Sequence, residues 1–225
     1  NTTREAATAS GLKDSSRQEE AVRPSPPERV AEYRRLGWWR GRTIDQLFSE
    51  AVRARPDAVA LVDAPNRMAL TDSAPQSLTF REANARVDTL CHVLADLGVG
   101  RGDVVSTQLP NIVEGVLCFL ACARMGAILS PLAMTYRAHE LRQILPSIVP
   151  KVVITLDHFH GFDHVAMIAG LRAEGATSAE IITQSASQTG AAHRLARVAD
   201  RHAVAAQERD IGAGGGAGLF EIVGV

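Results

Sequence analysis

The sequence has few of the residues that proteins use to bind nucleic acids or anionic membranes. Of its 225 residues only two are lysines, Lys13 and Lys151, and aromatic residues make up 4%. The 24 Lys and Arg residues are balanced by 25 Asp and Glu residues, so the formal net charge is −1. Nucleic-acid binding requires a basic surface, and single-strand binding also requires aromatic stacking platforms. We therefore expect no nucleic-acid partner.

Cysteine is also rare, and long uncharged hydrophobic runs are missing. Three cysteines, an odd number, argue against a secreted disulfide scaffold and fit a reducing compartment. The most apolar stretch, residues 112–134, contains Glu114 and Arg124, and the run between them is nine residues long. A membrane-spanning helix needs about 20. Residues 1–20 lack the apolar core of a signal peptide. The sequence thus predicts a soluble, cytoplasmic protein without a membrane span.

Composition divides the chain into three segments. Residues 1–28 are rich in Ser, Thr, Ala, Glu and Arg, and we expect a disordered arm because they cannot bury enough apolar surface. Residues 29–184 carry regular hydrophobic patterning and are the expected domain. Residues 185–225 end in a glycine-rich, low-complexity stretch and are expected to form a separate tail. Because 46% of all residues are hydrophobic, a wholly disordered chain is excluded.

The clearest local pattern predicts a helix that begins after Thr79. Thr79 at the N-cap and Glu82 three residues later form a capping box. Apolar residues then recur at helical spacing up to Leu97, and Gly98 supplies the left-handed residue that ends the helix. Asn111 and Glu114 repeat the cap chemistry at the start of a second apolar helix.

Short strands alternate with helices along the expected domain. The predicted strands are residues 58–62 (a short buried strand), 104–108, 127–132 and 152–155, and further helices are predicted at 43–55 and 137–145. Strands and helices that alternate in this way imply crossover connections and a parallel sheet. The fold class is α/β, with a mostly parallel sheet. Beyond Gly170 the pattern weakens, and only Ile181 and Ile182 indicate a strand end.

Six sequence blocks occur in an order and at separations typical of one enzyme superfamily. They are Leu78-Thr-Phe-Arg-Glu82, Gly98-Val-Gly-Arg-Gly-Asp-Val-Val105, Leu109-Pro-Asn-Ile-Val-Glu114, Ala123-Arg-Met-Gly-Ala-Ile-Leu-Ser-Pro-Leu132, Tyr136-Arg-Ala-His-Glu-Leu141 and Pro150-Lys-Val-Val-Ile-Thr155. The chain thereby resembles the N-terminal part of the AMP-forming acyl-CoA synthetases, the superfamily of acyl and aryl-CoA ligases, adenylation domains and luciferases. Trp38-Trp39, Gly41 and residues 159–167 resemble its medium-chain and cyclohexanecarboxylate-CoA ligase-like branch.

The resemblance implies a partial N-terminal domain of the adenylate-forming enzyme fold. Members of the superfamily activate a carboxylic acid with ATP to an acyl-adenylate and pass the acyl group to the CoA thiol. The implied cofactors of the complete enzyme are therefore ATP, Mg²⁺ and CoA, and the implied substrate is a small or medium-chain acid. In the superfamily, the six blocks frame the active site and do not hold the nucleotide.

The motifs that hold phosphate and Mg²⁺ in the superfamily are not intact in this sequence. The nearest counterpart of the phosphate loop is the stretch from Ser185 to His193, in which a histidine replaces the expected lysine. The non-functional interpretation of this stretch is a polar surface loop. We assign no catalytic, cofactor-binding or metal-binding residue to this chain. A truncated or frame-shifted gene product, with a tail that is foreign to the superfamily, would explain the pattern.

Three further features have a structural and a functional interpretation. Residues 157–164 contain three histidines and two aspartates, which favours a strand-to-helix connection with exposed histidines over a metal site. Cys118 and Cys122 lie four residues apart on one helix and fit small buried apolar residues better than redox groups. Residues 212–217 match a dinucleotide-binding fingerprint formally, but no hydrophobic strand precedes them.

The sequence thus predicts the N-terminal fragment of an ATP-dependent acid–CoA ligase that is inactive in isolation. The alternative is a binding or assembly module that a separate chain completes. Because part of a larger sheet would expose edges and apolar faces, we also expect self-association. We expect no tight binding of ATP, Mg²⁺ or CoA by this chain.

Overall fold

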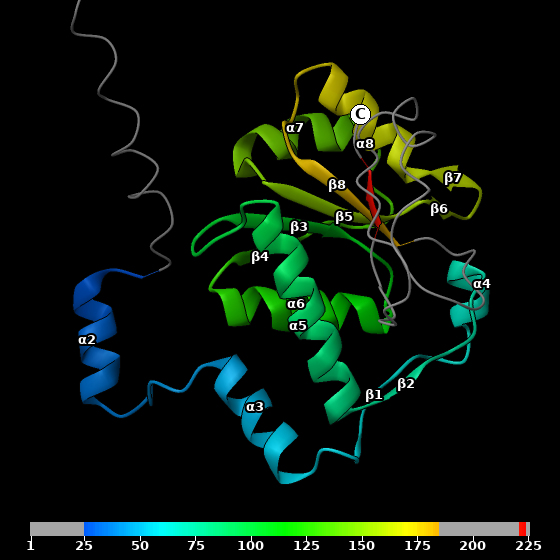
Figure 1. Ribbon diagram of the computed structural model, residues 1–225. Coiled ribbons are helices and arrows are strands. Elements are labelled where there is room, and N and C mark those ends of the chain that lie inside the picture. The colour runs from blue at the N-terminus through cyan, green and yellow to red at the C-terminus, as the bar shows by residue number, and fades with distance from the viewer. Residues whose placement is uncertain (1–24, 185–220, 224–225) are drawn as a thin grey trace, which may run out of the picture. The chain divides into compact units, whose positions relative to one another are not determined.

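The structure is a computed structural model in which residues 25–184 and 221–223 are described (Figure 1). The chain divides into two units, residues 1–42 and 43–225. In the first unit, helix α2 spans Pro27–Arg35 and so begins within the segment 1–28 that was expected to be disordered. Proline suits this position because it has no N–H to leave unpaired at a helix start.

An aromatic cluster follows α2 within the first unit. The ring of Tyr33 lies 5.3 Å from the ring of Trp38 and 5.2 Å from that of Trp39, measured between centroids. Both tryptophans stay exposed. The chain turns back at Gly37, whose backbone has a left-handed φ of 73°, and this turn brings the rings together.

The second unit is an α/β structure around a five-stranded sheet. Its strand order is β4-β3-β5-β8-β9, with the first four strands parallel and β9 antiparallel. The strands are β3 (Val104–Gln108), β4 (Ile128–Pro131), β5 (Val152–Leu156), β8 (Glu180–Gln184) and β9 (Glu221–Val223). The helices are α3 (Ile44–Ala54), α4 (Arg67–Thr71), α5 (Phe80–Asp96), α6 (Val113–Met125), α7 (Ala138–Ile148) and α8 (His164–Ala173). The predicted α/β class and parallel sheet are confirmed.

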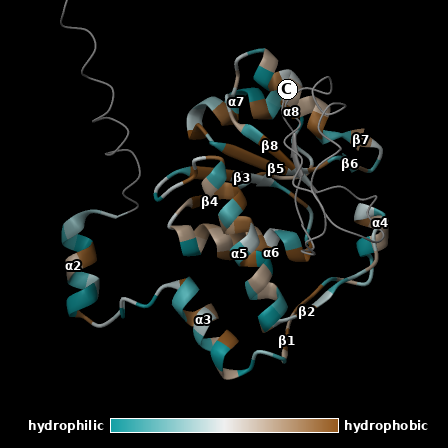
Figure 2. Cartoon of the chain, viewed as in Figure 1, coloured by the Kyte–Doolittle hydropathy of each residue, from teal (hydrophilic) through white to brown (hydrophobic). Residues whose placement is uncertain are grey.

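Helices cover both faces of the sheet, as Figure 1 shows. Helices α5 and α6 pack on one face with Val105, Ile154 and Ile182. Helices α7 and α8 pack on the other face, where Val153 and Ile181 join their apolar residues. Because both faces are covered, the central strands are hydrophobic on both sides, which Figure 2 shows for β5 and β8.

Two small antiparallel hairpins complete the second unit. Strands β1 (Val59–Val62) and β2 (Ser77–Thr79) form the first, and β6 (His158–Phe159) and β7 (Phe162–Asp163) form the second. The expectation of a buried strand at 58–62 was wrong in one respect, because Val59 and Val62 are 61% and 65% exposed. β1 pairs only with β2 and lies outside the central sheet. It therefore lacks the two helix layers that bury both faces of the central strands.

Local signals predicted the main helices and their ends well. The Thr79 hydroxyl accepts the N–H of Glu82, and the Glu82 carboxylate accepts the N–H of Thr79 at 2.8 Å, which confirms the capping box. Gly98 adopts the predicted left-handed conformation at the end of α5, and Gly126 adopts the same conformation at the end of α6. Helix α7 continues beyond the predicted residue 145 to Ile148, with Pro146 in its last turn.

None of the helices in the described part of the chain has the length and apolar character that a membrane crossing requires.

Candidate functional site

The connections between strands define one edge of the sheet as the candidate site. From β3 the chain passes through α6 to β4 on one side, whereas from β5 it passes through α8 to β8 on the other side. β3 and β5 are neighbours, so the chain leaves their carboxyl ends in opposite directions. Such a switch point in an open α/β sheet is where ligands bind. The side chains at this edge are therefore the candidates for ligand binding.

Gln108, the last residue of β3, holds the loop that follows β4. Its side-chain nitrogen donates hydrogen bonds to the carbonyl oxygens of Ala133 at 2.9 Å and Tyr136 at 3.1 Å. The backbone carbonyl of Gln108 accepts the hydroxyl of Thr155 at 3.2 Å. Gln108 is fully buried. One buried residue, through its side-chain amide and its backbone carbonyl, thus connects the ends of β3 and β5 to the loop after β4.

His164, the first residue of α8, completes this network. Its Nδ1 lies 3.2 Å from the side-chain oxygen of Gln108. That oxygen can only accept, because the Gln108 nitrogen is already directed to two carbonyls, so Nδ1 carries the proton and donates. Burial lowers the pKa of His164 to about 4, and the positive charge of Arg137 acts in the same direction. The imidazole is therefore neutral at pH 7.

The prediction for residues 157–164 was correct for the connection and wrong for one histidine. The segment does join β5 to α8, through the β6–β7 hairpin. His158 and His160 are exposed, but His164 is fully buried. The ring of Phe162 lies 5.0 Å from that of His164 in an edge-to-face contact, and the bond to Gln108 supplies the polar partner that burial requires. In the described ranges, no group of three or more His, Cys, Asp or Glu side chains could hold a metal ion.

A buried ion network holds the start of α6 beside the same edge. Arg67 of α4 donates two hydrogen bonds to Glu114, at 2.7 and 2.8 Å, and a third to Asp63 at 2.8 Å. The other oxygen of Asp63 accepts the backbone N–H of Val113 at 2.9 Å. Burial alone would lower the pKa of Arg67, but its bonds to Glu114 and the two negative charges outweigh burial and raise it.

The predicted role of Glu114 as a cap for its own helix was therefore wrong. Asp63, which follows β1, supplies the acceptor at this helix start, and neither Asn111 nor Ile112 makes a side-chain cap bond. Glu114 instead accepts bonds from Arg67 and from the Gln76 side chain at 2.9 Å. The charges of Arg67 and Glu114 can be buried because each is paired and hydrogen-bonded.

Sequence reasoning missed Asp63, Arg67 and Gln108 and the true partner of Glu114, and each leaves a signal in retrospect. Asp63 and Arg67 are charged residues that follow the end of β1, and Gln108 ends a strand of otherwise short side chains. Glu114 is the one charge in the first two turns of a mostly apolar helix. A charge or amide embedded in an apolar pattern indicates a buried partner, although it does not identify which residue that partner is.

A cavity of about 520 Å³ opens beside the carboxyl ends of β3 and β4. Most of its wall is apolar, with Asp63, Thr107 and Asn111 as its polar members. The apolar members include Leu61, Val62, Leu109, Pro110, Val116 and Leu129. This is the edge at which the switch-point rule places a ligand.

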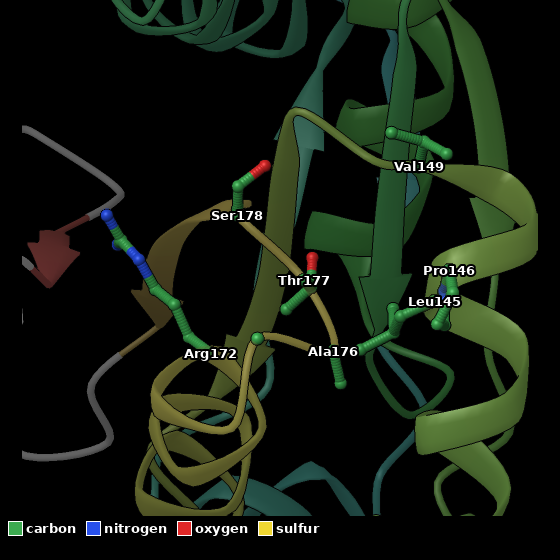
Figure 3. A pocket seen from close by; sticks show the side chains of 8 residues that line it. Leu145, Pro146, Val149, Arg172, Ala176, Thr177 and Ser178 are labelled. Atoms are coloured by element: carbon green, nitrogen blue, oxygen red, sulfur yellow. The ribbon is translucent and has the colours of Figure 1, made fainter.

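A second cavity, of about 510 Å³, lies at the opposite edge of the sheet (Figure 3). Leu145 and Pro146 of α7 lie on one side of it, and Thr177 and Ser178, which precede β8, lie on the other. Because these residues surround the amino end of β8, the cavity is far from the switch point along the strands. Arg172 at its rim is paired with Glu180 at 3.2 Å. We do not assign a site to it.

The described residues do not fit a triphosphate or a magnesium ion. Asp63 and Glu114 are both bound to Arg67, and Gln108 and His164 are bound to each other. Phosphate binding uses a cationic group beside a glycine-rich loop. Lys151 does lie beside the glycine-rich turn 98–102, but its Nζ donates to the Gly98 carbonyl and is paired with Asp103, each at 2.8 Å, at the amino end of β3 and away from the switch point. The stretch from Ser185 to His193 and residues 212–217 lie outside the described residues.

The sequence matches the AMP-binding enzyme family over residues 48–212. The chain belongs to this family. The match continues past residue 184, where the expected domain boundary was placed, and that boundary stays a prediction. The predicted resemblance to the superfamily of acid–CoA and adenylate-forming ligases is confirmed.

Two relatives illustrate the extent of the similarity. The salicyl-AMP ligase / salicyl-S-ArCP synthetase of Mycobacterium tuberculosis is 33% identical over 159 residues, which are 71% of this chain and 27% of that protein. The salicylyl-CoA synthase / salicylate adenylyltransferase of a Streptomyces species is 36% identical over 145 residues, 64% and 24% of the two chains. The chain thus spans about a quarter of the length of these relatives.

Solved structures of the family share the fold. The acetoacetyl-CoA synthetase from Streptomyces lividans matches 67% of this chain and 23% of its own, with a TM-score of 0.55 and 28% identity. A fatty acyl CoA synthetase from Mycobacterium tuberculosis matches 63% and 26%, with a TM-score of 0.52 and 26% identity. The α/β sheet is therefore the N-terminal part of a larger adenylate-forming architecture in these proteins.

Proposed function

We propose that this chain is the N-terminal part of an enzyme that activates a carboxylic acid with ATP and transfers the acyl group to a thiol acceptor such as CoA. The observation that carries the proposal is the family match over residues 48–212 together with a parallel sheet that has its switch point between β3 and β5. In this role the chain supplies one wall of the active site and the loops that frame it.

We further propose that the 225-residue chain does not activate an acid alone. The polar groups at the carboxyl edge satisfy one another: Arg67 neutralises two buried carboxylates, and Gln108 fixes His164 in a neutral form. Stabilising a transferring phosphoryl or adenylyl group requires cationic or N–H donors directed at the developing charge. Because the polar groups at this edge are engaged with one another, we propose that ATP, Mg²⁺ and CoA bind through parts of the enzyme that the described residues do not include.

The substrate we propose is an aromatic carboxylic acid. The two relatives above act on salicylate according to their names, and another relative, from Vibrio cholerae, is a 2,3-dihydroxybenzoate-AMP ligase that is 31% identical over 121 residues. A small or medium-chain acid, which the sequence resemblance implied, is the competing assignment. The rings of Phe159 and Phe162 pack against the buried His164, so the likeness of this stretch to the medium-chain branch has a structural basis that is independent of the acid.

Acid-dependent exchange of pyrophosphate into ATP tests these proposals. Two proteins would be compared with Mg²⁺ present: the 225-residue chain, and a chimera in which the remaining part of the M. tuberculosis salicyl-AMP ligase follows its aligned region. We expect no exchange from the chain alone and exchange from the chimera with salicylate or benzoate. Thr189 lies in the stretch from Ser185 to His193, the nearest counterpart of the phosphate loop. Exchange by the chain alone that is lost on Thr189→Ala would overturn the proposed inactivity. Exchange only with aliphatic acids would overturn the aromatic assignment.

A binding module completed by a separate chain is a second candidate. The exposure of Val116 and Phe119 on α6, at 40% and 42%, favours it because these residues lie on the helix that also lines the 520 Å³ cavity. The same assay distinguishes the two functions. Exchange restored by mixing this chain with the separate remainder of the ligase, without covalent linkage, would support the module.

A further inference from the structure

Three buried polar atoms in the described part of the chain have no hydrogen-bond partner. They are the hydroxyl oxygens of Ser106 and Thr183 and the Nε2 nitrogen of His164. All three residues are at most 5% exposed. Buried polar atoms in folded proteins are almost always paired, with protein or with ordered water, so each of these atoms requires an explanation.

Ser106 of β3 and Thr183 of β8 lie on the same face of the sheet, and His164 of α8 lies over that face. Ser106 is in register with Val153 of β5, and Val153 is in register with Ile181 of β8. Val153 and Ile181 belong to the apolar cluster under α7 and α8. Side chains in register on parallel strands point to the same face, so Ser106 faces α7 and α8 as well.

Two residues further along each strand, the same face carries a row of polar side chains. Gln108 is in register with Thr155, and Thr155 with Thr183. His164 reaches this row through its bond to Gln108, and α8 packs against both β5 and β8. Thr183 and His164 therefore lie at the same level between the sheet and α8, at the carboxyl edge.

The chemistry of the three atoms fits a small neutral ligand. Because Nδ1 of His164 holds the proton, Nε2 is an acceptor and needs a donor. A hydroxyl group can donate or accept. No carboxylate is hydrogen-bonded to any of the three side chains, and no three-ligand metal cluster occurs in residues 25–184. Water is both a donor and an acceptor, and buried water usually makes about three hydrogen bonds.

We propose that the space between α8 and the sheet is a buried hydration site, in which water donates to Nε2 of His164 and bonds to the hydroxyl of Thr183. Ser106 is not part of it, because its strand is two positions from that of Thr183 in the sheet, which is about 10 Å. The site joins β8 to α8 beside the switch point. It does not depend on the proposed enzymatic function, because it concerns the packing of this chain alone.

A hydration site and an unpaired hydroxyl predict opposite effects of Thr183→Val on the stability of the chain. If water bonds to the hydroxyl, the valine variant loses a hydrogen bond, and the unfolding equilibrium constant rises several-fold. If the hydroxyl is unpaired, the valine variant removes a buried unsatisfied group and is equally or more stable. Thr155→Val is the matched control, because its hydroxyl has a known partner in the Gln108 carbonyl and its loss destabilises in either case.

A double-mutant cycle tests whether Thr183 and His164 share the water. His164→Asn keeps a side-chain N–H for Gln108 at the position of Nδ1 but removes Nε2. Urea unfolding of the full chain would be measured for Thr183→Val, His164→Asn and the double variant. We expect the double variant to be clearly less destabilised than the sum of the single variants. Additive effects, with Thr183→Val neutral or stabilising, would overturn the proposal.

A direct measurement on the unmodified chain does not depend on whether the variants fold. In the unmodified chain, nuclear Overhauser effects between a long-lived water and the Thr183 methyl group or the His164 ring protons are expected. Their absence, in spectra that resolve both residues, would also overturn the hydration site.

Discussion

Arg67 and Glu114 are 47 residues apart in the chain and form a two-fold hydrogen-bonded ion pair with N–O distances of 2.7 and 2.8 Å. The two side chains are 2% and 0% exposed. The pair joins α4, which lies between β1 and β2, to the start of α6, which follows the carboxyl end of β3. It therefore fixes the position of one wall of the candidate site from outside the central sheet.

Removing Arg67 should destabilise the chain more than neutralising Glu114. Arg67→Met leaves Asp63 and Glu114 buried without a counter-charge, and we expect a loss of about 3–5 kcal/mol in the free energy of unfolding. Glu114→Gln leaves Arg67 paired with Asp63, so its cost should be smaller. Urea unfolding followed by circular dichroism would measure both. Arg142→Met, which breaks the exposed pair with Glu174, is the control and should cost at most about 1 kcal/mol. If Arg67→Met cost no more than Arg142→Met, the buried pair would not hold this wall.

His164 should make stability fall as the medium becomes acidic. Its pKa is about 4 in the folded chain and 6.5 in the reference state, so the unfolded state binds the proton first as pH falls. The stability contribution is complete above pH 6.5 and is lost as the pH falls from 6.5 to 4, by about 3 kcal/mol at most. The slope of unfolding free energy against pH in this window is the measurement.

The His164→Asn variant separates the contribution of His164 to this slope from that of carboxylates, which titrate in a neighbouring pH range. The variant should be less stable than the unmodified chain at pH 7 and should lose little further stability between pH 6.5 and 4.5. His139→Asn, at an exposed position of α7, should keep the full slope. An unchanged slope in His164→Asn would mean that this histidine is not held neutral.

The three cysteines should differ in reactivity although all are free thiols. Burial raises the pKa of Cys122 to about 12 and raises that of Cys118 well above its usual range. Cys91 is half-buried, and burial also raises its pKa. Since the thiolate is the reactive form, a disulfide reagent at pH 8 should modify Cys118 and Cys122 only after unfolding. Mass spectrometry of the native and guanidinium-treated chain would check this. Rapid modification of Cys118 in the native chain would contradict the packing of α6.

How far the sequence could predict the structure depended on the distance between interacting residues. Thr79 and Glu82 are three residues apart, so their capping box and the start of α5 could be recognised directly. The alternation of β-branched segments with helices was likewise enough to indicate a parallel sheet, because each crossover unit is contiguous in the chain. The candidate site is different, since the bonds from Arg67 to Glu114 and from His164 to Gln108 join residues 47 and 56 positions apart.

Glu114 and His164 show why the site was not predicted. Glu114 occupies a position near a helix start where local rules favour a cap, but the buried guanidinium of Arg67 is a stronger partner. His164 follows two other histidines in a polar stretch, which indicates exposure. Its burial is decided by Gln108, 56 residues earlier. Neither partner can be identified from spacing, because the strand order that brings them together is a property of the whole sheet.

Self-association through α6 is the last expectation that can be tested in this chain. Val116 and Phe119 lie three residues apart and therefore on one face of α6, and both are exposed although they are apolar. Exposed apolar patches promote association when nothing covers them. Sedimentation velocity at increasing concentration should show dimers or larger species for the unmodified chain and fewer for Val116→Thr with Phe119→Gln. Leu47→Gln, which removes an equally exposed side chain from α3, is the matched control. If the chain sediments as a monomer at all concentrations, or if Leu47→Gln reduces association equally, the α6 face is not the contact.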